Sequence, residues 1–436
     1  MEKFKTFWKN LLNSIKAVFI AVGVFFKEKV WAPIVKFLSP VGKFLWKYLQ
    51  YVCVPIGKFF SWVLSHKACR AIASSVICIL LGIFAGFIVM LIRDPANCFA
   101  GLGVLFTSGF AKPSNIARIL MNMTPMILAG LSISFAFKLG LFNIGVTGQL
   151  TMGAFLAFVT AFYGGNWFLC MLVGMLGGAF VGAISGFLKA KFNVNEVLSG
   201  IMLNWIVYYL TSLLGSALPG EFIDSFNNAQ LAKMPSNGRT PSLAAEGTTF
   251  YCVTWGLIIA ILIAILFWAI LKYTKFGFEM KLCGSNKFAA RYAGINQNQK
   301  IILSLLLSGA IAGICGYFVF SNPSSPRAFT YNSLDGVMIP DGFSGISVAL
   351  IGQTDPIGCI FSAFFLNYIT EAQTRIVNVS ILYSKYYMEL IKSIIIYVAS
   401  FSAFFGMLIQ NSNLKHKQMI DESFKNLFVR EKAEEK

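Results

Sequence analysis

The sequence is poor in charge and almost free of histidine. Only 12% of its 436 residues are charged and 57% are hydrophobic, with a mean hydropathy of +0.70. Because a soluble chain carries about 25% charged residues, this composition excludes a water-soluble globule, and a chain this apolar does not stay disordered in water. His66 and His416 are the only histidines, and both lie outside the hydrophobic stretches. This position argues against a histidine-ligated metal centre or a histidine base.

Sequence motifs for catalysis and for nucleotide hydrolysis are missing as well. There is no GxxxxGK[ST] phosphate loop, no GxSxG elbow and no HExxH pair. The nine cysteines include no CxxC pair and are odd in number, which favours free, buried thiols over a disulfide framework or a metal site. We therefore expect neither an enzyme nor a chain that hydrolyses ATP itself.

Long apolar stretches are abundant. Stretches of about 20 residues can cross a membrane, and they lie near 72–92, 116–138, 147–163, 167–188, 196–217, 251–271, 300–320 and 386–408. Two shorter pieces, 342–352 and 356–372, flank a polar turn that would leave unsatisfied groups in lipid. We expect that turn inside the bundle or at a water-filled cavity. The predicted fold class is an all-α polytopic membrane protein with about ten membrane elements, two of them short or re-entrant.

Lysine and arginine in the connecting segments predict the orientation, because they are retained on the cytoplasmic side. Segment 272–300 carries six basic residues and one acidic residue, whereas segment 218–250 carries two basic and three acidic residues. The first is therefore predicted to be cytoplasmic and the second external. With ten crossings, both chain termini are then cytoplasmic.

Much of the positive charge lies in an N-terminal arm, residues 1–70. The arm holds twelve of the 36 basic residues but two of the 18 acidic ones, so it carries more than half of the net charge of +18. No basic, aromatic-lined groove remains elsewhere, so we expect no nucleic-acid partner. Pro-x-x-Lys-Phe recurs at Pro33, Pro40 and Pro55, which is typical of a segment lying against lipid headgroups. A poorly ordered tail and a partner-docking arm are the alternatives. Residues 411–436 form a charged cytoplasmic tail.

Polar residues at membrane depth are costly and therefore informative. Asn143 and Gln149 flank glycines between two apolar runs, which predicts a broken helix lining a cavity or, alternatively, a tight cytoplasmic turn. Asn204, Trp205 and Tyr208 combine amide and aromatic groups inside one span, which favours either a solute pathway or a lipid-interface belt.

Three other features have simpler interpretations. Glu196 opens a span, where helix capping explains it more simply than proton coupling does. Gly178, Gly182 and Gly186 repeat every four residues and predict close helix packing. Glu389 and its neighbour three residues on, Lys392, are expected to neutralise one another.

The cytoplasmic loop 272–300 contains an Ala289-Ala290 pair between Gly284 and Gly294. This pattern predicts a short helix with small residues on one side, which can fit a shallow groove on another protein. Topology alone would also explain the basic residues of the loop.

Together these motifs resemble one family, the membrane permease subunits of bacterial ATP-binding-cassette importers for nucleosides and simple sugars. The resemblance covers about residues 72–410. It depends on the order and spacing of five segments, Thr124–Leu131, Leu141–Gln149, Asn195–Trp205, Gly284–Asn296 and Gly342–Gly352. Two residues depart from the family pattern. Phe288 stands where such loops often have an acidic residue, and Thr147 stands where the nucleoside branch commonly has Glu.

The resemblance implies a transmembrane permease domain at 71–410 in a multi-pass protein of the bacterial cell membrane. It implies that the chain holds no cofactor, that a cytoplasmic ATPase binds ATP and Mg²⁺, and that an external solute-binding lipoprotein and a second, different permease subunit complete the importer. Its residues for ATPase coupling are then Gly284, Ala289, Ala290, Arg291 and Gly294. Those for the substrate pathway are Asn143, Gln149, Asn204, Trp205 and Tyr208. Bulky replacements at positions 290 and 294 should uncouple uptake.

Two alternatives remain open at this stage. A branched-chain amino-acid permease of the same importer class would share most of these motifs. An ion-coupled secondary transporter would need coupling carboxylates within the spans, and the candidates Glu196, Asp355 and Glu389 lie near ends or turns.

Overall fold

The computed structural model describes residues 67–227, 229–331, 338–377, 379 and 383–401. The chain divides into two units, Ala71–Ile409 and a second unit made of Met1–Arg70 with Gln410–Lys436. Only the first unit is described below. The predictions for the basic arm and the charged tail lie outside the described residues and stay predictions.

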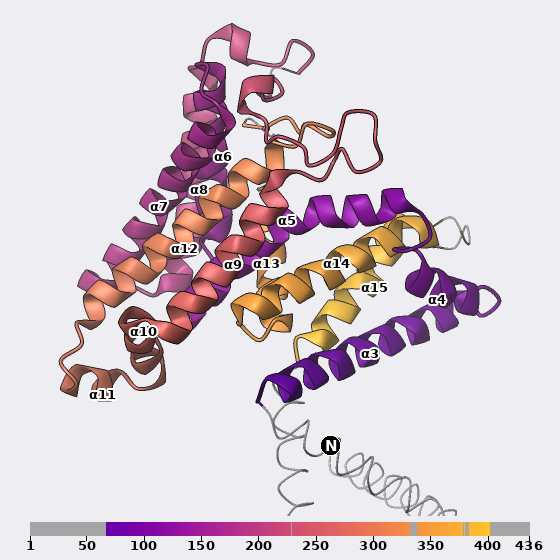
Figure 1. Ribbon diagram of the computed structural model, residues 1–436, viewed down its shortest axis with the longest axis horizontal. Coiled ribbons are helices and arrows are strands. Elements are labelled where there is room, and N and C mark those ends of the chain that lie inside the picture. The colour runs from indigo at the N-terminus through magenta and orange to yellow at the C-terminus, as the bar shows by residue number, and fades with distance from the viewer. Residues whose placement is uncertain (1–66, 228, 332–337, 378, 380–382, 402–436) are drawn as a thin grey trace, which may run out of the picture. The chain divides into compact units, whose positions relative to one another are not determined.

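The described part is helical throughout and contains no strand, only isolated β-bridges (Figure 1). Its longer helices are α3 (Lys67–Arg93), α5 (Pro113–Phe137), α7 (Trp167–Phe192), α8 (Glu196–Ser216), α9 (Trp255–Tyr273), α12 (Gln297–Phe320) and α14 (Pro356–Ile376). The shorter ones are α4 (Cys98–Thr107), α6 (Val146–Phe162), α10 (Lys275–Ser285), α11 (Lys287–Tyr292), α13 (Asp341–Ile351) and α15 (Lys385–Ala399). The 3-10 turns η2 (Gly220–Phe222) and η3 (Ser236–Gly238) lie in the loop before α9.

The predicted all-α membrane fold is confirmed. Nine of the ten predicted apolar elements coincide with a helix, and the tenth, 386–408, overlaps α15 as far as Ala399, while its residues beyond 401 lie outside the described residues. Six described helices are long and apolar enough to cross a membrane, or seven if the bent α13–α14 pair counts as one span. The exact number of crossings and the side on which the termini lie stay predictions. Sequence reasoning missed α4 and α10. Helix α4 has only ten residues, which is too short to suggest a membrane span. Helix α10 lies in the long loop and contains basic residues, so it shows no apolar stretch.

Side chains at the helix starts explain where several helices begin. Asn166, Asn195, Asn286 and Asn296 precede α7, α8, α11 and α12, and each side chain accepts hydrogen bonds from backbone N–H groups of the first turn. Asp355 does the same for α14. Such caps satisfy N–H groups that have no partner within the helix.

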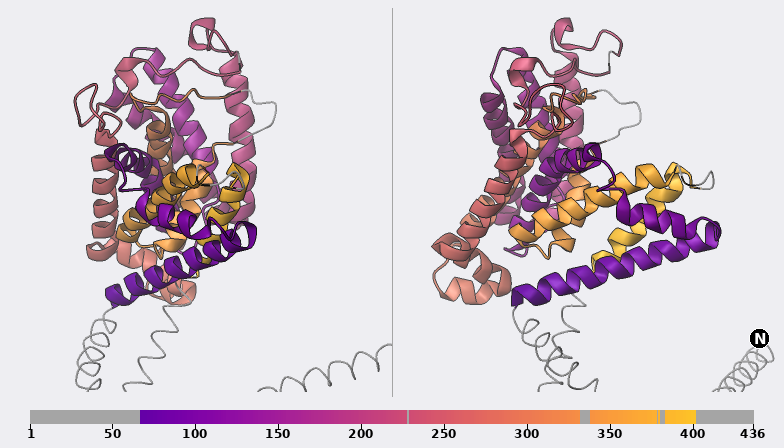
Figure 2. Two further views of the ribbon diagram at one scale, coloured as in Figure 1. Left: turned by 90° about the vertical axis from the view of Figure 1, so that its right-hand side faces the viewer. Right: turned by 45° about the vertical axis from the view of Figure 1, so that its right-hand side comes forward.

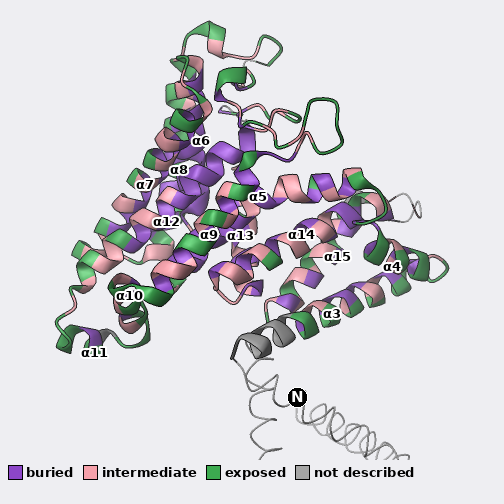
Figure 3. Ribbon diagram, viewed as in Figure 1, coloured by how far each residue is buried: buried purple, intermediate pink, exposed green. Residues whose placement is uncertain are grey.

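The core of the bundle depends on glycine at the contact between α7 and α12. A β-carbon on Gly178 would overlap the carbonyl oxygen of Gly309 and lie 2.6 Å from backbone atoms of Gly313, and one on Gly186 would lie 2.9 Å from the Cα of Ile302. The predicted packing role of the glycine repeat is therefore confirmed. Figure 3 shows buried residues concentrated along α5, α6 and α12, while α3 and α4 are largely exposed.

A second, smaller hydrophobic cluster joins α3, α4, α15 and the last part of α14. It includes Met90, Cys98, Tyr383 and Ile391, and from α14 it takes Ile369, Ala372 and Ile376. The earlier residues of α14, Cys359, Ala363 and Leu366, belong instead to the main core. Helix α14 therefore connects the two clusters.

Helices α13 and α14 meet at a bend of 117°. The polar turn between them is satisfied within the chain. The backbone N–H groups of Gln353, Thr354 and Asp355 donate to Leu350, Ala349 and Gly352, and Lys138 donates to the Thr354 hydroxyl at 3.3 Å. These contacts place the turn beside the C-terminal end of α5. The turn residues Gln353, Thr354 and Asp355 are half-buried, so the turn packs at the end of the bundle, and its predicted position inside the bundle or at a water-filled cavity stays a prediction.

Candidate functional site: the helix break, the α8 face and the α10–α11 loop

The segment between α5 and α6 returns into the bundle before α6 begins. Asn143 donates to the hydroxyl of Ser308 at 2.7 Å and to the side-chain oxygen of Gln149 at 2.9 Å, and Ser308 in turn donates to the carbonyl of Ser132 at 2.7 Å. Ser132 and Ser308 lie inside α5 and α12, and all four side chains are buried. The polar side chains of this segment are therefore buried within the bundle, and the choice between a broken helix that lines a cavity and a tight cytoplasmic turn stays a prediction.

Asn204 holds α8 against this break. Its side chain accepts a hydrogen bond from the backbone N–H of Gly148 at 2.8 Å and donates to the carbonyl of Ile144 at 3.1 Å. These two backbone groups lie where α6 has not yet formed regular helical bonds. An unpaired buried polar group costs about 1–3 kcal/mol, so Asn204 stabilises the irregular backbone and couples α8 to it.

Next to this contact, the hydroxyl of Thr147 is buried and has no hydrogen-bond partner. It packs on Gly342 at the start of α13, where an added β-carbon would lie 2.5 Å from it.

The three aromatic residues of α8 separate onto two sides of the helix. Tyr208 is buried, whereas Trp205 and Tyr209 are 40% and 63% exposed. The rings of Trp205 and Tyr209 stack at 6.0 Å with an interplanar angle of 24°, and Tyr208 meets each of them edge-on. Of the predicted pathway residues, Asn143, Gln149, Asn204 and Tyr208 are thus buried inside the protein and only Trp205 reaches the surface. Tyr209 lies beside it.

The loop 272–300 folds into α10 and α11, at the opposite end of α9 from the segment 218–254 (Figures 1 and 2). The predicted short helix is α11, capped by Asn286. Ala290 is fully buried, while Ala289 and Arg291 are exposed. A bulky replacement of Ala290 would therefore disturb internal packing and would not test an outer contact.

Phe288 and Tyr292 are large aromatic side chains that α11 exposes, at 78% and 94%. They lie four residues apart and therefore share one face of the helix. Sequence reasoning treated Phe288 only as a departure from the family pattern and did not select Tyr292. The sequence feature that could have revealed this face is the four-residue spacing of the two aromatics on either side of the alanine pair.

Glycines connect the α10–α11 loop to the bundle. A β-carbon on Gly284 would overlap the carbonyl oxygen of Lys138 at the end of α5, so the loop contacts the chain that leads into the helix break. Gly294 has a φ of +73° and open space around it. That φ strains any other residue type, so a substitution there tests backbone strain as much as docking.

Glu279 fastens α10 to α12, and it gives the first testable prediction. It lies 2.5 Å from Lys300 and 4.0 Å from Lys275, and the hydrogen bond from Lys300 lowers the pKa of the Glu279 carboxyl. A carboxyl with a lowered folded-state pKa stabilises the fold above its unfolded pKa, about 4.3, and loses this effect as pH falls through the folded value. We expect Glu279→Gln to lower the melting temperature at pH 7, with the difference from wild type disappearing under acid conditions. A difference that is independent of pH would contradict this.

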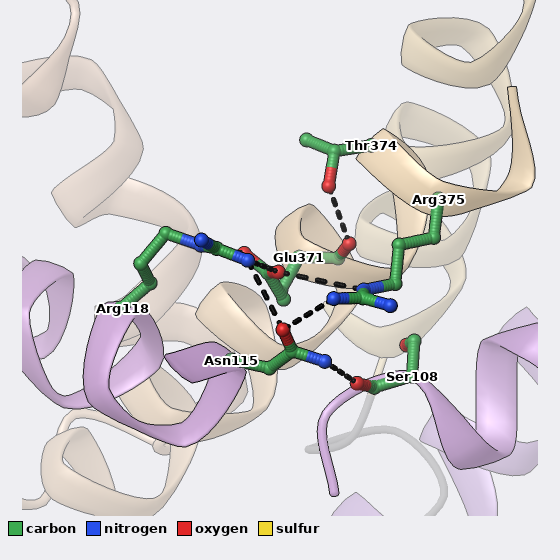
Figure 4. Close-up of polar contacts among 6 residues, drawn as sticks. All are labelled: Ser108, Asn115, Arg118, Glu371, Thr374 and Arg375. Carbon is green, nitrogen blue, oxygen red and sulfur yellow. Dashed lines mark hydrogen bonds and ion pairs between the residues drawn. The ribbon is translucent and has the colours of Figure 1, made fainter. Parts of the chain in front are cut away.

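An ion cluster at the other end of α5 was missed by sequence reasoning (Figure 4). Arg118 on α5 donates to both carboxylate oxygens of Glu371 on α14, at 3.1 and 2.6 Å, and Arg375 lies 3.7 Å from the same carboxylate. Both guanidiniums also donate to the side-chain oxygen of Asn115. Asn115 is fully buried and bonds the carbonyl of Ser108. The sequence feature that could have revealed this cluster is Glu371, an acidic residue between two apolar runs in the segment Tyr368–Arg375.

Two of the carboxylates considered for ion coupling have structural partners in the chain. Glu196 lies 2.9 Å from Lys189. Glu389 lies 2.8 Å from Lys392, as the sequence predicts, and accepts from Gln373 at 2.9 Å. Within the described ranges, no group of three or more His, Cys, Asp or Glu residues could hold a metal ion.

The described helices form a membrane bundle in which buried polar residues connect α5, α6, α8 and α12, and the loop 272–300 folds into two helices. The family described as "Branched-chain amino acid transport system / permease component" matches residues 115–400, and the chain belongs to this family. It is thus a multi-pass protein of the cell membrane.

Three relatives define the likeness further. The chain is 33% identical to the guanosine ABC transporter permease protein NupP of Bacillus subtilis, over 66% of this chain and 82% of that protein. It is 31% identical to the nucleoside ABC transporter permease protein NupB of Lactococcus lactis, over 71% and 85%. It is 28% identical to the glucose ABC transporter permease protein TsgB13 of Haloferax volcanii, over 62% and 72%.

Proposed function

We propose that the chain is the membrane subunit of an ATP-driven importer for nucleosides or simple sugars. The family description names branched-chain amino acids, whereas the relatives named above carry guanosine, nucleosides or glucose in their names. The relatives align over most of their own length, so they support the nucleoside and sugar assignment over the amino-acid one. The ion pairs of Glu196 and Glu389 give no support to an ion-coupled mechanism.

The proposed partners follow from the same likeness. A cytoplasmic ATPase supplies the energy, since the chain lacks a phosphate loop. A second permease subunit of a different sequence completes the pathway, because the relatives include two pairs from single organisms, NupP with NupQ and NupB with NupC. An external solute-binding lipoprotein delivers the solute. The basic residues of segment 272–300 predict that the α10–α11 loop lies on the cytoplasmic side.

The proposed mechanism is alternating access driven by the ATPase. The ATPase docks on the face of α11 that carries Phe288 and Tyr292. Its movement reaches the bundle through Gly284, which contacts Lys138, and then reaches the helix break through the chain that leads to Asn143. Asn204 passes the movement to α8. These contacts show only which residues lie next to one another. Mutations have to test whether a change at one contact alters the free energy of the next.

Reconstitution tests the proposed function. The full complex of this chain, its second permease subunit and its ATPase is placed in vesicles with the solute-binding protein, and uptake of labelled guanosine, ribose, glucose and leucine is measured with and without ATP. We expect ATP-dependent uptake of guanosine or a sugar. Uptake of leucine alone, or uptake that persists without ATP and collapses with an ionophore, would overturn the proposal.

The exposed aromatic face of α11 gives the second prediction. Removing a well-packed aromatic from an interface typically costs about 2 kcal/mol or more. We therefore expect Phe288→Ala and Tyr292→Ala each to weaken ATPase binding at least about tenfold and to reduce ATP-driven uptake, with an unchanged melting temperature because both side chains are exposed. Phe278→Ala on α10, which is 64% exposed, is the matched control. If the control weakens ATPase binding as strongly, the docking face is wrong.

A further inference from the structure

The exposed aromatic pair on α8 lies far from either end of its helix. Helix α8 has 21 residues and is therefore about 31 Å long. Trp205 and Tyr209 lie about 14 and 20 Å from its start. They thus lie near the middle of the bilayer and not at a headgroup boundary, where tryptophan and tyrosine are normally enriched.

The chemistry of these two rings does not suit a lipid-facing position. In hydrocarbon at mid-depth an indole N–H or a phenol O–H finds no acceptor, which costs several kcal/mol. The mid-span residues that α7 exposes are purely apolar, as Leu176 (62%) and Phe180 (64%) show. Helix α8 also exposes apolar side chains beside the pair, Met202 (51%) and Ile206 (57%), so the indole N–H and the phenol O–H are what distinguish this face from the one that α7 exposes.

The pair also sits directly beside the helix break. Asn204, the residue before Trp205, bonds the backbone of Gly148 and Ile144. The platform is therefore fixed to the irregular segment that starts α6, and a movement of that segment would carry the rings with it. The rings of Trp205 and Tyr209 are nearly parallel and one helical turn apart. A planar ring of a solute can stack on such aromatic faces without hydrogen bonds to the edge of that ring.

We propose that Trp205 and Tyr209 form a stacking platform for a planar heteroaromatic solute, such as a nucleobase, in the central path of the importer. This inference depends on the proposed function and selects nucleosides over sugars, because a sugar ring has no π face. Tyr208, buried behind the pair and edge-on to both rings, holds them in place. The platform, not the amides of the break, is then the surface that the solute meets.

Guanosine uptake by the complete complex tests the platform, with the amount of each variant in the membrane measured in parallel. Base stacking on an aromatic is worth about 1–3 kcal/mol, so Trp205→Leu should reduce guanosine uptake by about tenfold or more. Trp205→Phe keeps a π face and should stay within about threefold of wild type. Phe180→Leu, which also removes an exposed mid-span ring but on α7, should have no effect. Equal uptake by Trp205→Leu and wild type, or equal losses for the Leu and Phe variants, would overturn the proposal.

Thiol labelling provides an independent measurement. Tyr209→Cys and Leu176→Cys replace residues of almost equal exposure, 63% and 62%. We expect a membrane-impermeant thiol reagent to label position 209 but not 176, and guanosine to slow the labelling at 209. If the two positions are equally unreactive, the rings face lipid and the proposal is wrong. A wild-type complex that carries sugars but not guanosine would overturn the platform alone, whereas one that carries neither overturns the proposed function itself.

Discussion

Replacing Gly178 by leucine is expected to remove most of the folded protein from the membrane. The β-carbon would overlap the carbonyl oxygen of Gly309 and the backbone of Gly313. These are backbone atoms and cannot rotate away, so α7 and α12 would have to separate. Overpacking a well-packed site costs about 1–3 kcal/mol, and we expect Gly178→Ala to lie in that range and Gly178→Leu to exceed it. The measurement is the amount and melting temperature of detergent-solubilised protein.

Gly103 on α4 supplies the matched control, because a β-carbon there has no atom within 4 Å. Gly103→Ala is expected to leave stability unchanged or raise it by about 0.5–1 kcal/mol, the ordinary gain for removing a glycine from a helix. If Gly178→Ala and Gly103→Ala have the same melting temperature, the α7–α12 contact is looser than the structure shows.

Replacing Glu371 by glutamine is expected to have the second-largest effect. Glu371 is the single carboxylate between Arg118 and Arg375, and it lies on the stretch of α14 that joins the two hydrophobic clusters. Glutamine would leave two neighbouring guanidiniums without a counter-charge. Breaking a buried ion pair costs about 3–5 kcal/mol, and because the Arg118 side chain is 47% exposed we expect about 1–3 kcal/mol here, read as a fall in melting temperature.

The order of effects within the cluster is the sharper test. Arg118→Ala leaves Arg375 to neutralise Glu371, so it should cost less than Glu371→Gln. Glu389→Gln is the control, because Glu389 belongs to a pair within α15 whose glutamate side chain is 46% exposed, and it should change stability little. Arg118→Ala proving as damaging as Glu371→Gln would show that packing, and not charge balance, explains the cluster.

Membrane-spanning helices were the most predictable part of the fold, because hydrocarbon imposes a length and a composition on them. Within the described residues a helix appears at each of the predicted apolar elements, and the four-residue glycine repeat predicts its packing role. Helices α4 and α10 were missed since neither is long and apolar enough to stand out. Both are stabilised by tertiary contacts, as the buried Cys98 and Cys283 show.

The candidate site was less predictable. The spacing of Asn143, Gln149 and Asn204 predicted an irregular segment between two helices. It did not predict that these side chains are buried, or that they form hydrogen bonds with Ser308, Gly148 and Ile144. Which of two adjacent tyrosines accompanies Trp205 depends on the rotation of α8 about its axis. That rotation is fixed by Asn204, through bonds to residues 56 and 60 positions earlier in the chain.

The sequence by itself determined that this chain crosses a membrane as helices and which segments carry its polar groups. These properties follow from composition and local spacing, on which lipid acts directly. Only the tertiary structure decided that Ala290 points inward while Phe288 and Tyr292 point outward, and that Glu371 meets Arg118 across 253 positions. Such pairings depend on how helices rotate and pack against one another, and no local pattern specifies that geometry.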